Sequence, residues 1–210
     1  SQPGEGMWVE DPGFPLIRPV VAQERIALMP VPVDANGLDV CAGIRDYPQA
    51  RFVLLTPAHQ SPLGVALSLE RRHQLLEWAA RTQAWIIEDD YDSESNFTLN
   101  PLPALKASDR SGRVVYVSSL SKALSPGLRL GFMVADPDLI DEARALRRLV
   151  YRHPPTNIQY QMAHFLAQGH YETHLRRYHY DSAQRWERLH AALQRYLPSC
   201  RALAGSEHAN

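Results

Sequence analysis

The sequence is short of net charge, of cysteine and of long apolar runs, and each shortage excludes a class of protein. Its 22 basic and 23 acidic side chains give a formal net charge of -1, which does not indicate a nucleic-acid-binding surface. Cys41 and Cys200 are the only cysteines, so neither a disulfide framework nor a thiolate metal site is supported. No apolar run is long enough to span a bilayer and no leader segment opens the chain, so we expect a cytoplasmic protein that makes no membrane contact.

Lysine is also scarce, and this narrows the search for a reactive amine. Twenty of the basic residues are arginines, which leaves Lys106 and Lys122 as the two lysines. An arginine stays protonated and cannot form a Schiff base, whereas a lysine can lose its proton. Any amine chemistry must therefore use Lys106 or Lys122.

What the chain does have is the composition of a globular domain, with 45% apolar and 21% charged residues, enough to bury a core. Short, continuous apolar runs alternate with helical patterns, and continuous apolarity indicates strands that are buried on both faces. The sequence therefore predicts a three-layer α/β/α fold with a mostly parallel sheet. The predicted strands are Met7–Val9, Ile26–Val31, Phe52–Leu55, Trp85–Ile87, Val114–Val117 and Leu130–Val134.

Several helices can be predicted from their caps and apolar spacing. Ser68 can cap a helix, and Asp136 followed by Pro137 is typical of another helix start. After Pro155 a shorter helix is expected, followed by a long one that stops before Pro198. The expected apolar faces are Leu69, Leu76 and Ala80 for the first helix, Leu139, Ala143, Leu146 and Val150 as a buried stripe of the second, and a stripe from Leu175 through Tyr178 to Tyr196 for the last.

Polar side chains gather after three neighbouring predicted strands, in the segments Thr56–Gly64, Glu88–Glu94 and Ser118–Lys122. The carboxyl ends of parallel strands share one edge of a sheet, where ligands bind. A lysine, a carboxylate, a phenol, serine hydroxyls and an arginine at one edge fit pyridoxal phosphate, whose aldehyde condenses with an amine and whose ring nitrogen needs a carboxylate. Alternation along the strand places Asp89 and Tyr91 on one face and Asp90 on the other.

A metal site is the rival interpretation of the acidic run. Asp90, Asp92 and Glu94 alternate as calcium ligands do. An EF-hand loop that starts at Asp90 needs glycine at its sixth position and glutamate at its twelfth, where Ser95 and Pro101 stand. We therefore predict no metal site.

Three motifs together resemble the aminotransferase-like domain of MocR-type regulators in the GntR superfamily. They are Thr56–Gly64, Glu88–Glu94, and Ser119 to Lys122 with Pro126–Gly131, supported by Pro101–Leu105 and Arg152–Pro155. The similarity runs from about Met7 to about Leu197. It implies fold type I of the pyridoxal phosphate enzymes, and a homodimer.

The resemblance also implies roles for single residues. Lys122 would form the internal aldimine with pyridoxal phosphate, Asp89 would pair with the pyridinium nitrogen, and Tyr91 with the ring hydroxyl. Ser119 and Arg129 would hold the phosphate. Ser61 stands where aminotransferases carry asparagine and MocR relatives phenylalanine. We expect His59 to structure its loop, and Asp92 and Glu94 to be loop or interface charges.

The domain organisation and function follow as expectations from the same resemblance. Residues 1–152 would form part of the pyridoxal phosphate-binding large domain, and residues 153–210 a helical segment leading to a C-terminal small domain that the chain lacks. An aromatic ring stacked on the cofactor, a backbone phosphate cradle and a DNA-binding domain would come from upstream, so this segment itself would contact no nucleic acid. The chain would be an effector-sensing domain for an amino compound; the alternative is part of a catalytic aminotransferase, so enzymatic activity stays open.

Overall fold

The computed structural model describes residues 5–92, 94, 102–120, 122–152 and 155–198. Its centre is a seven-stranded sheet in the order β3-β2-β1-β4-β5-β6-β7. The run from β2 to β6 is parallel, while β3 and β7 pair antiparallel at the two edges. The mostly parallel sheet is as predicted, and so are six of its strands. The strands are β1 Gly6–Asp11, β2 Ala27–Asp34, β3 Gly37–Leu38, β4 Ala50–Leu55, β5 Trp85–Asp90, β6 Val114–Ser119 and β7 Gly131–Val134.

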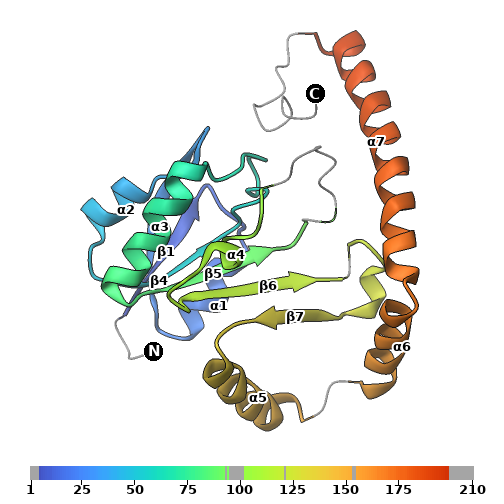
Figure 1. The fold of residues 1–210 in the computed structure, drawn as a ribbon. Helices are drawn as coiled ribbons and strands as arrows, with labels where there is room; N and C mark the ends of the chain where they lie inside the picture. Colours follow the sequence, from blue (N-terminus) through green and yellow to red (C-terminus); the bar gives the residue numbers. More distant parts are fainter. Residues whose placement is uncertain (1–4, 93, 95–101, 121, 153–154, 199–210) are drawn as a thin grey trace.

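Helices lie on both faces of this sheet, as a three-layer fold requires (Figure 1). In Figure 1, α2, α3 and α4 lie in front of the strands and α1 lies behind them. The sequence patterns did not predict α1, α2, α4 or the short edge strand β3. The helices are α1 Ile17–Gln23, α2 Val40–Asp46, α3 Leu69–Thr82, α4 Leu105–Ser108, α5 Pro137–Tyr151, α6 Thr156–Ala167 and α7 His170–Tyr196, and a 3-10 turn covers Pro126–Leu128.

Alternate residues of β1 build the two halves of the core. The Trp8 ring is fully buried and stacks on Trp78 of α3, with ring centroids 4.0 Å apart. Met7 and Val9 point to the opposite face and pack against Val21 of α1. The alternation is what a strand covered on both faces requires, and it fixes the carboxyl end of β1 in the middle of the sheet.

Helix α3 begins as predicted, since the Ser68 hydroxyl accepts a hydrogen bond from the Arg71 backbone N–H at 3.4 Å. The predicted face is right only for Leu76, which is partly buried against the core, whereas Leu69 and Ala80 are exposed. The buried residues of α3 are Arg72, Leu75, Trp78 and Ala79. Two tertiary contacts decide this face: Trp78 stacks on Trp8, and the Arg72 guanidinium donates to the carbonyls of Leu67, Pro103 and Pro57 at 2.9, 2.6 and 3.2 Å.

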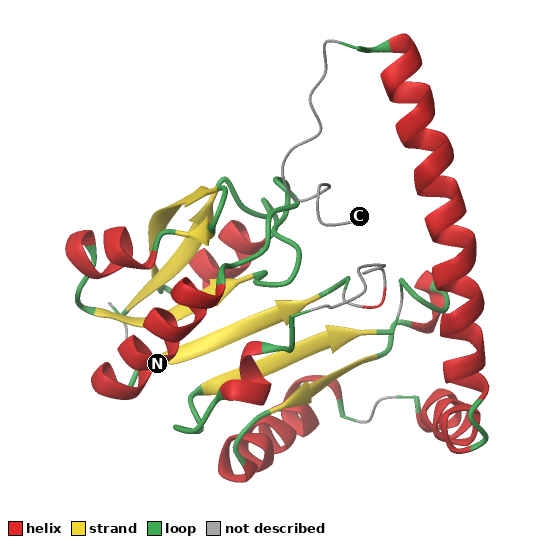
Figure 2. Cartoon of the chain, turned by 45° about the horizontal axis from the view of Figure 1, so that its top comes forward, coloured by secondary structure: helices red, strands yellow, loops and turns green. Residues whose placement is uncertain are grey.

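The buried stripes predicted for α5 and α7 are also wrong. Asp136 caps α5 as expected, accepting from the Asp138 N–H at 3.0 Å, but Leu146 and Val150 are 62% and 60% exposed. No residue of α5 or α7 is buried. In Figure 2, α7 extends away from the sheet. Leu175 and Tyr178 near its beginning are partly buried, whereas Leu189, Leu193 and Tyr196 farther along are exposed. Neither helix, nor any other described here, combines the length and apolarity needed to cross a bilayer.

Candidate functional site

The three polar loops do meet at one edge of the sheet. β4, β5 and β6 are parallel neighbours. Leu55, the last residue of β4, pairs with Glu88 near the end of β5, and Asp90, the last residue of β5, pairs with Ser118 near the end of β6. The loops that follow therefore leave the sheet side by side. The predicted convergence of these segments is confirmed for their described residues. Ser121, His153, Pro154 and Pro101, which belong to the sequence motifs, lie outside the described ranges.

Of the two lysines, Lys122 is the one at this edge. Its Nζ lies 4.0 Å from the centroid of the Tyr91 ring and 3.9 Å from Oδ1 of Asp92, and its side chain is about half exposed. Lys106 instead pairs with Asp109 at 3.1 Å in the turn before β6. The exposed amine above an aromatic ring is therefore the candidate for covalent chemistry.

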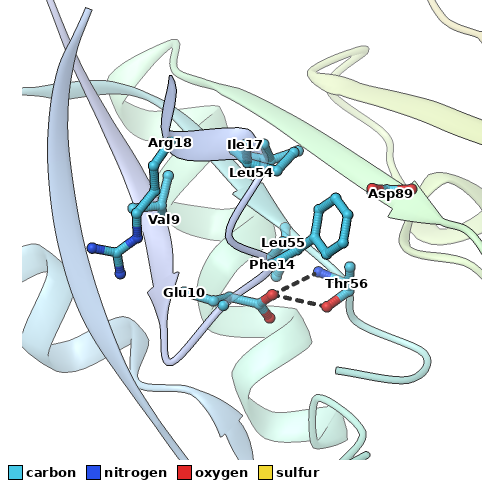
Figure 3. A pocket seen from close by; sticks show the side chains of 10 residues that line it. Val9, Glu10, Phe14, Ile17, Arg18, Leu54, Leu55, Thr56 and Asp89 are labelled. Carbon is cyan, nitrogen blue, oxygen red and sulfur yellow. Dashed lines mark hydrogen bonds between the residues drawn. The ribbon is translucent and has the colours of Figure 1, made fainter. Parts of the chain in front are cut away.

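Asp89 lines a pocket at the same edge (Figure 3). Burial raises the pKa of the Asp89 carboxyl, the charge of Asp90 adds to this, and Lys122 acts in the opposite direction. No described residue donates a hydrogen bond to the Asp89 carboxylate, whereas Asp90 accepts one from the Tyr116 hydroxyl at 2.5 Å. A half-buried carboxyl aimed into a pocket suits a protonated ring nitrogen as its partner.

The same pocket contains an aromatic ring that sequence reasoning overlooked. Phe14 lines it together with Asp89, and its ring stands between that carboxyl and the Glu10 side chain (Figure 3). We expected an aromatic ring that stacks on the cofactor to come from upstream of this chain. Phe14 lies within the chain, in the loop Pro12–Pro15 that follows β1, the parallel neighbour of β4. This fourth loop at the same edge could have been recognised by the reasoning applied to the other three.

Glu10 connects this fourth loop to the loop after β4. It is 8% exposed and accepts hydrogen bonds from the Thr56 backbone N–H at 3.3 Å and hydroxyl at 2.8 Å. Burial raises the pKa of Glu10 to about 7, against the two hydrogen bonds from Thr56, which lower it. The Gln60 amide donates to the carbonyls of Pro12 and Ser61 at 2.9 and 2.8 Å. These contacts fix both loops under the pocket.

The Tyr91 ring is packed between the loops after β4 and β6. Lys122 lies over it, and the His59 ring lies parallel to it at a centroid distance of 6.4 Å. Burial raises the pKa of the Tyr91 hydroxyl, the Asp92 charge adds to this, and the Ser61 side chain opposes it. The structure thus brings Ser61 close to Tyr91.

Asp92 lies in the loop after β5, as expected, and it contacts two further loops, with Oδ2 3.1 Å from Nδ1 of His59 and Oδ1 3.9 Å from the Lys122 amine. Glu94 accepts a hydrogen bond from the Tyr171 hydroxyl of α7 at 3.1 Å. The sequence held no signal for the position of Asp92, because that position depends on how three loops pack.

Ser119 and Arg129 lie at the same end of the β6 and β7 pair. Ser119 is opposite Gly131 in the ladder, and Arg129 comes two residues earlier, in a left-handed conformation with φ of 46°. A Cβ on Gly131 would lie 2.7 Å from the Ser118 carbonyl oxygen, so the close approach of the two strands requires glycine there. The exposed Arg129 directly follows the 3-10 turn Pro126–Leu128 and comes just before β7.

Metal ligation finds no support in the geometry. Within the described ranges, no three His, Cys, Asp or Glu side chains are grouped so that they could hold a metal ion. The groups that do lie at this edge are an amine, a half-buried carboxyl, an aromatic ring and hydroxyls. This donor set fits an organic cofactor that carries an aldehyde and a basic ring nitrogen.

The fold and the site together define an α/β domain with a ligand site at the carboxyl edge of its sheet, of the class built by fold type I transferases. The chain belongs to the aminotransferase class I and II family, whose sequence model matches residues 1–204.

Curated relatives include transcriptional regulators. The chain is 36% identical over 194 residues to the probable rhizopine catabolism regulatory protein MocR of Rhizobium meliloti, covering 92% of this chain and 39% of that protein. It is 42% identical over 170 residues to the HTH-type transcriptional regulator TauR of Rhodobacter capsulatus, covering 81% and 34%. The chain thus spans under half the length of these relatives.

Solved structures confirm the predicted fold class. The kynurenine aminotransferase of Pyrococcus horikoshii, in complex with PMP, superposes with a TM-score of 0.87 at 26% identity, covering 94% of this chain and 50% of that one. The α-aminoadipate aminotransferase LysN of Thermus thermophilus, complexed with N-(5'-phosphopyridoxyl)-L-leucine, gives 0.85 at 27% identity, covering 93% and 51%.

Proposed function

We propose that this chain binds pyridoxal phosphate through Lys122 and forms the effector-sensing, aminotransferase-like domain of a MocR/GntR-type transcriptional regulator. The family match and the two aminotransferase structures with phosphopyridoxyl ligands support the cofactor. The regulators among the curated relatives support the sensing role. An amino compound is the effector class that fits a cofactor which reacts with amines.

The observation that carries the proposal is the meeting of Lys122, Asp89 and Phe14 at one sheet edge. The cofactor supplies an aldehyde and an electron-withdrawing ring when bound. The Lys122 amine provides the nucleophile, and its place over Tyr91 keeps it at the sheet edge. With the cofactor bound, Asp89 would hold the proton on the ring nitrogen, and Phe14, which lines the same pocket, would pack against the ring.

The remaining site residues bind the periphery of the cofactor in this proposal. The Tyr91 hydroxyl donates a hydrogen bond to the ring hydroxyl oxygen, and its neutral form is favoured because burial raises its pKa. Ser119 and Arg129 hold the phosphate with a hydroxyl and a guanidinium, the donors that suit a doubly charged anion. Their common position at the end of β6 and β7 supports this assignment.

Covalent trapping tests the proposal directly. Pyridoxal phosphate is added to the purified chain, borohydride reduces the adduct, and the labelled peptide is mapped. We expect the label on Lys122, its loss in Lys122→Ala, and its retention in the matched control Lys106→Ala, which removes the other lysine. A label that persists in a folded Lys122→Ala chain contradicts the assignment.

A catalytic aminotransferase is the second candidate, favoured by the aminotransferases among the solved structures. The same chain with bound cofactor can be given amino acids and a keto acid. Repeated turnover identifies an enzyme, whereas a single spectral change without turnover identifies a sensor. We expect the second result.

The proposal extends to the assembly, location and domain organisation of the protein. We infer a homodimer, because Leu149 of α5 and Tyr196 of α7 are 84% and 70% exposed, and light scattering tests this. We also propose a cytoplasmic location, residues 1–152 as the cofactor-binding large domain, and residues 153–210 as a helical segment that leads to a further domain. The formal charge of -1 is consistent with DNA contacts being made by another part of the regulator.

A further inference from the structure

One carboxylate joins two of the loops that build the site. Asp92 follows β5, and its two oxygens face different partners: Oδ2 lies 3.1 Å from Nδ1 of His59, in the loop after β4, and Oδ1 lies 3.9 Å from Nζ of Lys122, in the loop after β6. The Asp92 side chain is 16% exposed, whereas both partners are 52% exposed. The Asp92 carboxylate is therefore more buried than the His59 and Lys122 side chains that it contacts.

Among the described residues, few groups compete with Asp92 for the Lys122 amine. The Tyr91 ring lies below the amine and presents a π face, a weak attraction at an exposed site. Asp89 acts on Lys122 through its charge, but the ion pair at 3.9 Å is to Asp92. On the other side, the charged group near His59 is again Asp92, and the Gly64 turn packs against the His59 ring.

We propose that Asp92 is a positioning residue that holds the Lys122 amine over Tyr91, and that His59 shares the same carboxylate and so limits its hold on the amine. The inference deepens the proposed function and rests on it for its meaning at the cofactor site. An amine held in an ion pair must leave its carboxylate before it can attack an aldehyde. His59 and Asp92 would thereby set how readily Lys122 reacts with an aldehyde.

The two lysines allow the test to be made inside one molecule. Brief reductive methylation with formaldehyde and cyanoborohydride modifies both amines, and peptide mass spectrometry gives the ratio of methylation at Lys122 to that at Lys106. Formaldehyde is small and needs no cofactor site. The experiment therefore reads the amine itself, and its outcome does not depend on whether pyridoxal phosphate binds.

We expect Asp92→Asn to raise the Lys122 to Lys106 ratio by about two- to fivefold at neutral pH, the range typical of a solvent-exposed ion pair. His59→Gln removes the His59 contact from the Asp92 carboxylate, so the ratio should fall about twofold. In the double variant the ratio should equal that of Asp92→Asn, since His59 acts through Asp92. Asp46→Asn is the control, because Asp46 pairs with Arg45 on the surface, and its ratio should match the unsubstituted chain.

An unchanged ratio in folded Asp92→Asn overturns the proposal, and an effect of His59→Gln in the Asp92→Asn background overturns the sharing. A measurement without any substitution covers the case that Asp92→Asn does not fold. Salt screens the half-exposed Lys122 pair more than the Lys106 pair, whose Asp109 is fully buried. The ratio should therefore rise with salt, and a flat salt dependence counts against Asp92 as the holding group.

Discussion

The Glu10 carboxylate accepts two hydrogen bonds from Thr56, one from the backbone N–H at 3.3 Å and one from the hydroxyl at 2.8 Å. These bonds tie the carboxyl end of β1 to that of β4, directly beside the pocket that Phe14 and Asp89 line (Figure 3). An acid placed there is costly to ionise, because it is buried and Asp89 carries charge of the same sign.

The first prediction concerns stability and pH. The pKa of Glu10 is raised from its ordinary value of 4.5 to about 7. The stabilisation that comes from its tighter proton binding in the folded state is therefore fully present below pH 4.5 and is lost as pH rises through about 7. The loss amounts to about 3 kcal/mol in the free energy of unfolding. Urea unfolding at several pH values should show this decline in the unsubstituted chain, and in Glu10→Gln the decline should be smaller by about 3 kcal/mol, because the raised pKa values of Glu88 and Asp89 remain. The exposed control Glu70→Gln should keep the decline; equal pH profiles for Glu10→Gln and the unsubstituted chain contradict the prediction.

The second prediction concerns Phe14. Its ring is 46% exposed, so Phe14→Ala should cost little stability but should weaken pyridoxal phosphate binding about three- to tenfold, the contribution of one aromatic stacking contact. Fluorescence titration measures the Kd. Leu16→Ala is the matched control, because Leu16 is 64% exposed and does not line the pocket. Equal affinities of the two variants would falsify the role of Phe14.

The third prediction concerns the turn before β6. Burial alone would raise the pKa of Asp109, but hydrogen bonds from the Val114 N–H, Lys106 and Ser111 lower it to about 2. The resulting stability is present above the ordinary value of 3.8 and is lost as pH falls through about 2. Asp109→Asn should therefore cost about 2 kcal/mol at neutral pH. Denaturant unfolding of both chains checks the value, and the difference should shrink in acid; a constant difference would mean that charge is not the cause.

The fourth prediction concerns the buried arginine of α3. Arg72 donates to the carbonyls of Leu67, Pro57 and Pro103, and its charge faces Glu88 and Asp90. Arg72→Met should lower the free energy of unfolding by about 3 kcal/mol, because it leaves buried carbonyls and acids without a donor. Arg81→Met, on an exposed position of the same helix, should cost less than about 0.5 kcal/mol. Similar losses for the two variants would contradict the role given to the buried guanidinium.

The sheet and its polar edge could be predicted because their signals are local. Continuous apolar runs identify parallel strands, and Asp89, Tyr91 and Lys122 follow such runs directly. The face of α3 could not be predicted, since it depends on Trp8 from a distant strand and on carbonyls that satisfy Arg72. The same holds for Asp92, whose partners come from two other loops.

The apolar stripes of α5 and α7 show a different limit of sequence reasoning. Their periodicity correctly predicts helices, and amphipathic helices usually cover a core. Yet Leu146 and Val150 are exposed. Periodicity predicts that one face of a helix is apolar, but it does not predict which surface, if any, packs against that face. Phe14 was not predicted because the prolines around it interrupt the apolar pattern, so the end of β1 was not recognised from the sequence.

Two histidine side chains anchor helix α7 near its beginning. The His174 Nε2 donates to the Ala123 carbonyl at 2.6 Å, next to Lys122, and the His179 Nε2 donates to the Glu94 carbonyl at 2.5 Å. From His174 to Tyr196 the helix extends about 33 Å at 1.5 Å per residue, so a tilt of about 10° at the anchor displaces the far end by about 6 Å. A small change in the position of the Lys122 loop, if it tilted α7, would therefore produce a displacement of several ångströms at Tyr196, much larger than the change at the loop itself.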